Sequence, residues 1–134
     1  MVEATHLDEI RKDFLFLKGR VLGVVIFGSF AKNEHSEKSD IDICIVARNT
    51  PPSEILRTVF QNVDVVKKGY DVKVFEELPL YLKAEVIKNY LVVLGDPGEI
   101  GEYFRVFWKI WKDQEHRQKL TKEELKRILL NKTL

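Results

Sequence analysis

The sequence predicts an α/β (α+β) domain, in which helices pack against a β-sheet. Segments with apolar residues at every third or fourth position, typical of amphipathic helices, alternate along the chain with short runs of β-branched residues, typical of strands. The chain has 134 residues, which suits one compact domain better than two. We therefore expect one domain over residues 1–98, followed by a helical extension over residues 99–134 that packs on it.

The first predicted helix begins at Thr5 and ends at Lys18-Gly19, where the apolar repeat stops. The next segment, Val21–Phe27, is apolar throughout, as in a strand covered on both faces, so we expect it at the centre of the sheet. A Gly-Ser turn, a short helical piece near residues 30–32 and a polar loop over 33–39 should follow.

The strand predicted over Asp40–Val46 alternates in polarity. Because side chains point to opposite faces of a strand in turn, its three isoleucines share one face. The other face carries Asp40, Asp42, Cys44 and Val46. The pattern predicts one face packed on helices and one that begins as an acidic cleft and ends in the core.

Two helices and two strands are predicted between residues 51 and 94. An apolar helical stripe runs from Pro51-Pro52 to Gly69, although its part 63–66 also suits a strand. A strand over 70–75 places Asp71 and Lys73 on one face. A helix over 79–88 and a last strand over 90–94 complete the domain.

The extension is predicted to hold two helices, one from Glu99 and a second from the capping-box pattern Thr121-Lys-Glu-Glu124. Most aromatic side chains of the first fall on one side of it. We expect this aromatic side to pack on the domain. The alternative is a surface for a partner or for homo-oligomer formation, since so large an apolar area is unusual in a terminal helix.

Composition excludes several classes of protein. The net charge is +1, so no overall positive field attracts nucleic acid, and we do not expect the protein to bind it. One cysteine excludes an internal disulfide, and the three histidines lack the spacing of zinc ligands. The longest apolar run, residues 21–30, is shorter than the ~20 residues that span a bilayer, so we expect a soluble cytoplasmic protein without membrane association.

Asp40 and Asp42 are candidate metal ligands. Two positions apart on a strand, they project from the same face with α-carbons about 6.5–7 Å apart. Carboxylates this close repel each other without a cation, and two divalent ions about 3.5–4 Å apart are typical of phosphoryl-transfer sites. A third acid on the neighbouring strand would complete the site. Asp71 is the candidate for it, with Asp64 as the alternative.

Gly28 and Ser29 are candidate phosphate contacts. Glycine lets backbone amides approach an anion without interference from a β-carbon. Serine adds a hydroxyl, and an amide at the start of a short helix favours negative charge. Phosphate groups held by this turn would face cations held by Asp40 and Asp42.

These elements together resemble a known family. Phe27-Gly28-Ser29, ten residues and then Asp40-Ile-Asp42-Ile resemble the signature of the minimal nucleotidyltransferases, members of the DNA polymerase beta superfamily. Residues 69–79 are similar to that family's third-acid strand, and the resemblance covers about residues 7–95. It implies the nucleotidyltransferase fold, a mixed β-sheet flanked by helices, and transfer of a nucleoside monophosphate from a triphosphate with release of pyrophosphate.

The resemblance also implies roles for single residues. Gly28 and Ser29 would contact the triphosphate, Asp40 and Asp42 would bind two Mg²⁺, and Asp71 would be a ligand that helps to activate the acceptor hydroxyl. Family members often carry Arg and Gly soon after Gly-Ser, whereas Lys32 and Asn33 stand here. Lys32 is therefore the candidate cation for phosphate, and Lys73 is a second one.

The expected function is Mg²⁺-dependent nucleotidyl transfer, with ATP as substrate. Minimal family members are frequently antitoxins that inactivate a HEPN-type ribonuclease by adding AMP to a tyrosine, so the resemblance implies a HEPN-type partner protein. One alternative is a module without catalysis that neutralises a partner through its C-terminal helices. Another is nucleotidyl transfer to a small molecule.

Overall fold

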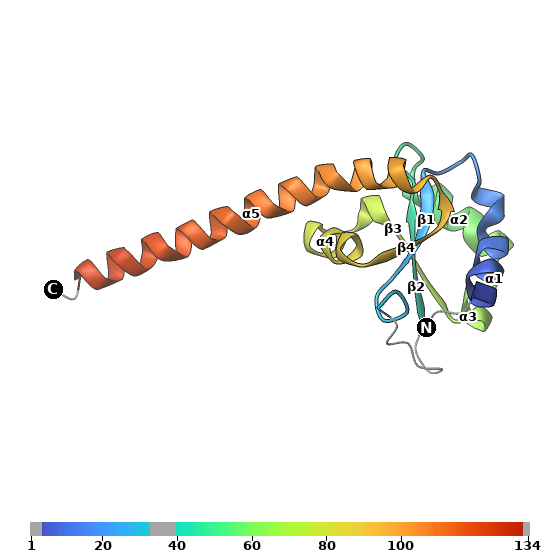
Figure 1. Ribbon diagram of the computed structural model, residues 1–134, viewed down its shortest axis with the longest axis horizontal. Helices are drawn as coiled ribbons and strands as arrows, with labels where there is room; N and C mark the ends of the chain where they lie inside the picture. Colours follow the sequence, from blue (N-terminus) through green and yellow to red (C-terminus); the bar gives the residue numbers. More distant parts are fainter. Residues whose placement is uncertain (1–3, 33–39, 133–134) are drawn as a thin grey trace.

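The protein folds around a four-stranded mixed sheet. The computed structural model describes residues 4–32 and 40–132 (Figure 1). The strands are β1 (Gly23–Phe27), β2 (Ile41–Val46), β3 (Tyr70–Val74) and β4 (Tyr90–Gly95), in the spatial order β3-β2-β1-β4. β1 is antiparallel to both of its neighbours, whereas β2 and β3 are parallel. The prediction that the apolar first strand lies inside the sheet is confirmed.

Helices cover both faces of this sheet (Figure 1). One face carries α1 (Ala4–Phe14), α2 (Pro52–Asn62) and the short α3 (Val65–Lys68). The other carries α4 (Leu80–Lys88) and the first part of α5 (Pro97–Lys132). Two short 3₁₀ helices, η1 (Leu15–Leu17) and η2 (Phe75–Glu77), follow α1 and β3. The predicted α+β class, a sheet with helices against it, is confirmed.

β2 divides its side chains between two apolar cores, as its alternation predicts. Ile43 and Ile45 are fully buried in the cluster beneath α1 and α2. Cys44 and Val46 are fully buried in the cluster beneath α4 and α5. In that second cluster the ring of Phe75 lies 4.7 Å, between centroids, from that of Phe104 in α5. Each face of one strand therefore holds a separate layer of helices.

The single helix predicted between residues 51 and 69 is wrong, because two helices occupy this segment. Val63 is extended, with φ −132° and ψ 130°, and it ends α2. The Asp64 carboxylate then accepts a hydrogen bond of 3.2 Å from the Lys67 amide, which caps α3. Gly69 ends α3 in the left-handed conformation, with φ 70°. Aspartate favours such caps over helix interiors, which explains the break.

The two helices predicted after residue 98 are likewise one continuous helix, α5. Thr121 lies inside it, where its hydroxyl donates to the Arg117 carbonyl four residues earlier (2.9 Å) instead of capping a new helix. Packing stops well before the helix ends: Trp111 is half-buried, and the described side chains from Lys112 onward are all exposed. In Figure 1 this distal part of α5 projects away from the sheet.

A glutamate fixes the packed part of α5 to the end of β2. The Glu76 carboxylate accepts hydrogen bonds from the Ala47 and Arg48 amides (2.9 and 3.1 Å) and from the Tyr103 hydroxyl of α5 (2.7 Å). Arg48 has φ 62°, an unusual value for a residue with a side chain. The two amide bonds hold this turn, and the tyrosine joins it to the helix.

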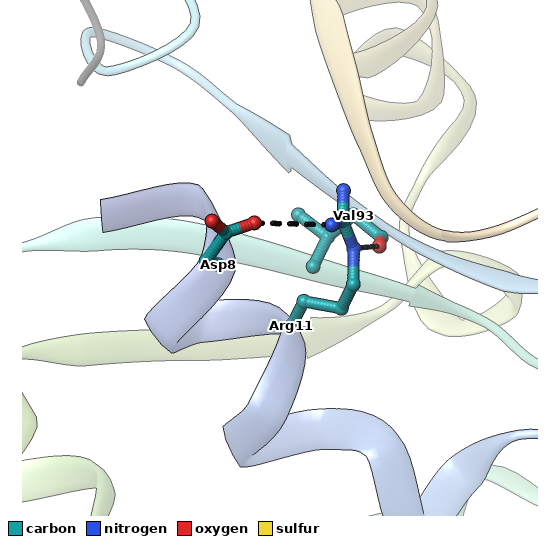
Figure 2. A network of polar contacts seen from close by, with 3 residues as sticks. All are labelled: Asp8, Arg11 and Val93. Atoms are coloured by element: carbon teal, nitrogen blue, oxygen red, sulfur yellow. Dashed lines mark hydrogen bonds and ion pairs between the residues drawn. The ribbon is translucent and has the colours of Figure 1, made fainter. Parts of the chain in front are cut away.

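β4 contains a bulge at Val93, and a side chain of α1 bonds to its backbone carbonyl. Val24 of β1 pairs with Leu94 and Val25 pairs with Val92, so Val93 has no partner in β1. The Arg11 side chain of α1 donates from Nε to the Val93 carbonyl (3.0 Å), and its Nη1 lies 3.2 Å from an Asp8 carboxylate oxygen (Figure 2). A bulge leaves a backbone group unpaired, and here an arginine partners it.

Candidate active site

Four in-register residues form a row across one end of the sheet. Asp71 of β3 lies beside Asp42 of β2, Asp42 lies opposite Phe27 of β1, and Phe27 lies opposite Tyr90 of β4. Side chains of paired residues share a face of the sheet. Phe27 and Tyr90 pack against the cluster beneath α4 and α5, which identifies the face of the row. Two acids and two aromatic rings therefore line the same end of the sheet.

Gly28 follows Phe27 directly and lies against the acid of the next strand. It has φ +73°, which L-amino acids rarely adopt. A β-carbon built on Gly28 would stand 3.2 Å from Asp42 Cγ, and nearer still to its Oδ2. Any side chain here would displace the carboxylate, so glycine is required for the approach of this turn to Asp42.

Asp40 stands just before β2 and is exposed. Its Oδ1 lies 3.9 Å from the position that a β-carbon on Gly69 would take, next to the turn that leads into β3. The Ile41 amide donates to the Gly69 carbonyl (2.8 Å), which fixes the start of β2 to this turn. Asp40 and Asp42 thus occupy alternate positions at the strand entry, and Asp71 enters the row from β3.

Lys73 pairs with Asp71. Its Nζ lies 2.7 Å from Asp71 Oδ2, and the two side chains are 37% and 45% exposed. In the described residues, no group of three or more His, Cys, Asp or Glu side chains is arranged to hold a metal ion. The available donors nevertheless fit Mg²⁺ chemically, because they are carboxylate oxygens, the ligands that this hard cation prefers. Lys73 is the cation that Asp71 contacts in this structure.

The turn that begins at Gly28 extends further along the chain than predicted. Residues 28–32 form a turn, closed by a hydrogen bond of 3.1 Å from the Lys32 amide to the Gly28 carbonyl, and the predicted helical piece at residues 30–32 is absent. Ser29 is half-buried and Lys32 is exposed. The predicted loop over residues 33–39, which includes Asn33, lies outside the described residues.

Asp64, the alternative third acid, is not part of the row, because it caps α3 and is exposed. Cys44 lies two residues after Asp42 on the same strand, but it is fully buried. Burial, and secondarily the Glu76 carboxylate, raise the pKa of the Cys44 thiol, which keeps it protonated. Asp64 is therefore excluded by its position at the α3 cap, and Cys44 is excluded because it is buried and protonated.

Phe27 and Tyr90 are site residues that no pattern in the sequence indicates. Both belong to strands without polar alternation, and only the register of β1 with β2 and β4 places them beside the acids. A cavity of about 470 Å³ opens next to Tyr90, between β4, α4 and α5. A second cavity of about 670 Å³ lies at the opposite end of the sheet, around Gly23 and Gly95, far from the row.

Comparison with known proteins identifies the family. The model of the nucleotidyltransferase domain family matches residues 7–94. The chain belongs to this family, and it is a nucleotidyltransferase. In the described residues, no helix is long and apolar enough to cross a membrane.

Curated relatives come from the archaeon Methanocaldococcus jannaschii. Over 98 residues, the chain is 45% identical to the protein named "Putative protein adenylyltransferase MJ1547", with 73% of this chain and 75% of that protein covered. A second protein with the same descriptive name, MJ0435, is 29% identical over 92 residues, with 66% of this chain and 99% of that protein covered. The similarity extends over most of the sheet domain in both.

Similar solved structures come from toxin–antitoxin complexes. A chain of a toxin–antitoxin crystal structure with AMP-PNP matches with a TM-score of 0.66 at 16% identity, covering 89% of this chain and 97% of that one. A chain of a complex between the tri-AMPylated HEPN toxin of Shewanella oneidensis and its MNT antitoxin matches with a TM-score of 0.62 at 13% identity, covering 90% and 96%. At these identities the likeness establishes the fold.

Proposed function

We propose that the protein transfers AMP from ATP, in the presence of Mg²⁺, to a hydroxyl group of a partner protein. The observation that carries this proposal is the in-register pair Asp42 and Asp71 beside Gly28, whose backbone lies against the Asp42 carboxylate. Acids and a glycine turn at one end of a sheet provide cation ligands and an anion contact side by side.

Each residue has a role in this proposal. Asp40, Asp42 and Asp71 would hold two Mg²⁺, which when bound supply charge neutralisation for the phosphate groups. Gly28 and Ser29 would hold the triphosphate through backbone amides and a hydroxyl, with Lys32 as a cation at the same turn. Lys73 would exchange its contact with Asp71 for a phosphate oxygen once cations are bound.

The reaction is an in-line substitution at the α-phosphorus. The acceptor oxygen forms the new bond, the bond from the α-phosphorus to the oxygen that bridges it to the β-phosphorus breaks, and pyrophosphate leaves with that electron pair. In this proposal Asp71 accepts the proton of the acceptor hydroxyl and passes it on to solvent. Positioning and electrostatic stabilisation provide most of the acceleration in such reactions.

A HEPN-type toxin, modified on a tyrosine, is the proposed acceptor. Support comes from the similar proteins: adenylyltransferases by name among the curated relatives, and complexes of an MNT antitoxin with a HEPN toxin among the solved structures. The chain would then act in the cytoplasm as the antitoxin of a pair.

The test is incubation with α-labelled ATP and Mg²⁺, with and without the protein encoded beside this one. Wild type should label that protein, and Asp42→Asn should reduce the labelling rate by at least about a hundredfold, because it removes a metal-ligating charge. Asp113→Asn, an exposed aspartate of α5, is the matched control and should label like wild type. Full labelling by a folded Asp42→Asn protein would contradict the assigned site.

A second candidate function, neutralisation of a partner by contact alone, is favoured by the distal part of α5. Its exposed apolar residues are Leu120, Leu125, Ile128, Leu129 and Leu130. Under this alternative, a stable complex with the neighbouring protein would form without labelling and would survive the combined Asp40→Asn and Asp42→Asn substitutions. Labelling that those substitutions abolish would exclude it.

A further inference from the structure

The cavity beside Tyr90 lies at the same end of the sheet as the acids, on the same face. Tyr90 is both a member of the cross-strand row and part of the cavity wall. It pairs with Phe27, the residue directly before Gly28. Neighbouring strands lie about 4.8 Å apart, so the cavity begins about one strand beyond the glycine turn.

The wall of this cavity combines aromatic rings with positive charge. Tyr90, Phe104 and Trp108 contribute rings, and the rings of Tyr90 and Phe104 meet edge to face at 5.0 Å between centroids. Lys88 and Arg105 contribute exposed cations at its rim. Trp108 is half-buried, so part of its ring is available to a ligand.

Gly101 keeps the cavity open. It lies in α5, where a β-carbon would stand 3.9 Å from the Tyr90 hydroxyl, and the space beyond it belongs to the cavity. Glycine inside a helix is unfavourable compared with other residues, and nothing about its backbone requires it here. The missing side chain leaves room beside the Tyr90 hydroxyl.

We propose that this cavity binds the nucleobase of the triphosphate. This inference rests on the proposed function and adds to it the half of the site that recognises the base. Aromatic faces and arginine stack on any nucleobase, and cations at the rim suit a ligand that carries phosphates. In this arrangement the acids and the glycine turn bind the triphosphate. The ribose lies between Gly28 and the cavity, which are about one strand spacing apart.

The experiment compares two ligands that differ only in the base: ATP and ribose 5′-triphosphate, each with Mg²⁺, titrated by calorimetry into the full-length protein. Gly101→Leu fills the cavity with a residue that helices favour. It should weaken ATP binding by about tenfold or more and leave the affinity for ribose 5′-triphosphate within about twofold. Gly98→Leu adds the same side chain at an exposed position of the same helix and should change neither affinity.

Trp108→Leu is the second variant, since it removes a ring without filling the cavity, and it should also lower the affinity for ATP alone. ATP affinity unchanged in both variants would overturn the inference, as would an equal loss for the two ligands. Wild-type protein that binds ribose 5′-triphosphate but gains nothing from the base would overturn the inference and leave the proposed function intact. Wild-type protein that binds neither ligand would overturn both.

Discussion

The two faces of the sheet are built from the same strands, but they differ in how far their apolar core extends along β2. Beneath α1 and α2, the face of β2 carries only isoleucines, and of these Ile43 and Ile45 are fully buried. Beneath α4 and α5, the same strand runs from the buried Val46 and Cys44 to the half-buried Asp42, which is outside the apolar cluster. A single alternating strand thus supplies a core on one side and a site on the other.

Each face also has one tyrosine that joins a helix to the sheet region through a carboxylate. The Tyr70 hydroxyl of β3 donates to Asp13 of α1 (2.6 Å). The Tyr103 hydroxyl of α5 donates to Glu76, which follows β3 (2.7 Å). These two tyrosine connections are therefore equivalent in kind, whereas the apolar layers of the two faces differ.

The largest effect on stability is expected from a charge introduced into the apolar face beneath α1 and α2. Ile43→Asp places a charge in a cluster without a partner for it, and it should lower the free energy of unfolding by at least about 4 kcal/mol. Val66→Asp introduces the same charge at a side chain that is 88% exposed, so it should stay within about 0.5 kcal/mol of wild type. Urea denaturation measures both, and a stable Ile43→Asp protein would disprove the assigned facing of β2.

A smaller loss tests whether the two tyrosine connections are equivalent. Tyr70→Phe and Tyr103→Phe keep the ring and remove the donor, so each should cost about 1 kcal/mol. Tyr81→Phe, at a tyrosine that is 58% exposed, is the control and should leave the urea midpoint unchanged. If one of the two variants behaved like the control, the hydroxyl of that tyrosine would contribute nothing measurable to the stability of its face.

Alkaline pH should weaken both connections together. Burial, and secondarily the neighbouring carboxylate, raise the pKa of Tyr70 and of Tyr103 above the ordinary value of 10.0. Above about pH 10, unfolded chains lose these protons while the native state keeps them, so stability falls as pH rises. The double Phe variant should lose less stability than wild type between about pH 8.5 and about pH 10.5. An equal loss of stability in wild type and in the double Phe variant would mean that other titrating groups cause the fall.

Local patterns predict the strands and their facing well, because alternation is a property of a few consecutive residues. Ile43 and Asp42 are assigned to opposite faces on that basis, and the structure agrees. The Gly-Ser turn and Asp40 are likewise visible in the sequence, since spacing alone marks them. Their roles as ligands remain predictions.

Features that depend on register or on context escape such patterns. Nothing local places Tyr90 beside Phe27, since this pairing joins segments far apart in the sequence and includes a bulge. Thr121 with Glu124 has the residues of a capping box, but the same residues are equally acceptable inside a helix, where the structure has them. At Val63-Asp64 the opposite happens, because the cap formed by Asp64 outweighs the apolar repeat.

The contact between Arg11 and Val93 also affects how the protein behaves among its neighbours. β4 is an edge strand, and the edges of sheets are where strands of separate molecules pair and begin to aggregate. Because the bulge interrupts the regular spacing and Arg11 already uses the Val93 carbonyl, a foreign strand finds neither a straight edge nor that acceptor (Figure 2). A bond within one molecule thereby helps to keep crowded copies apart.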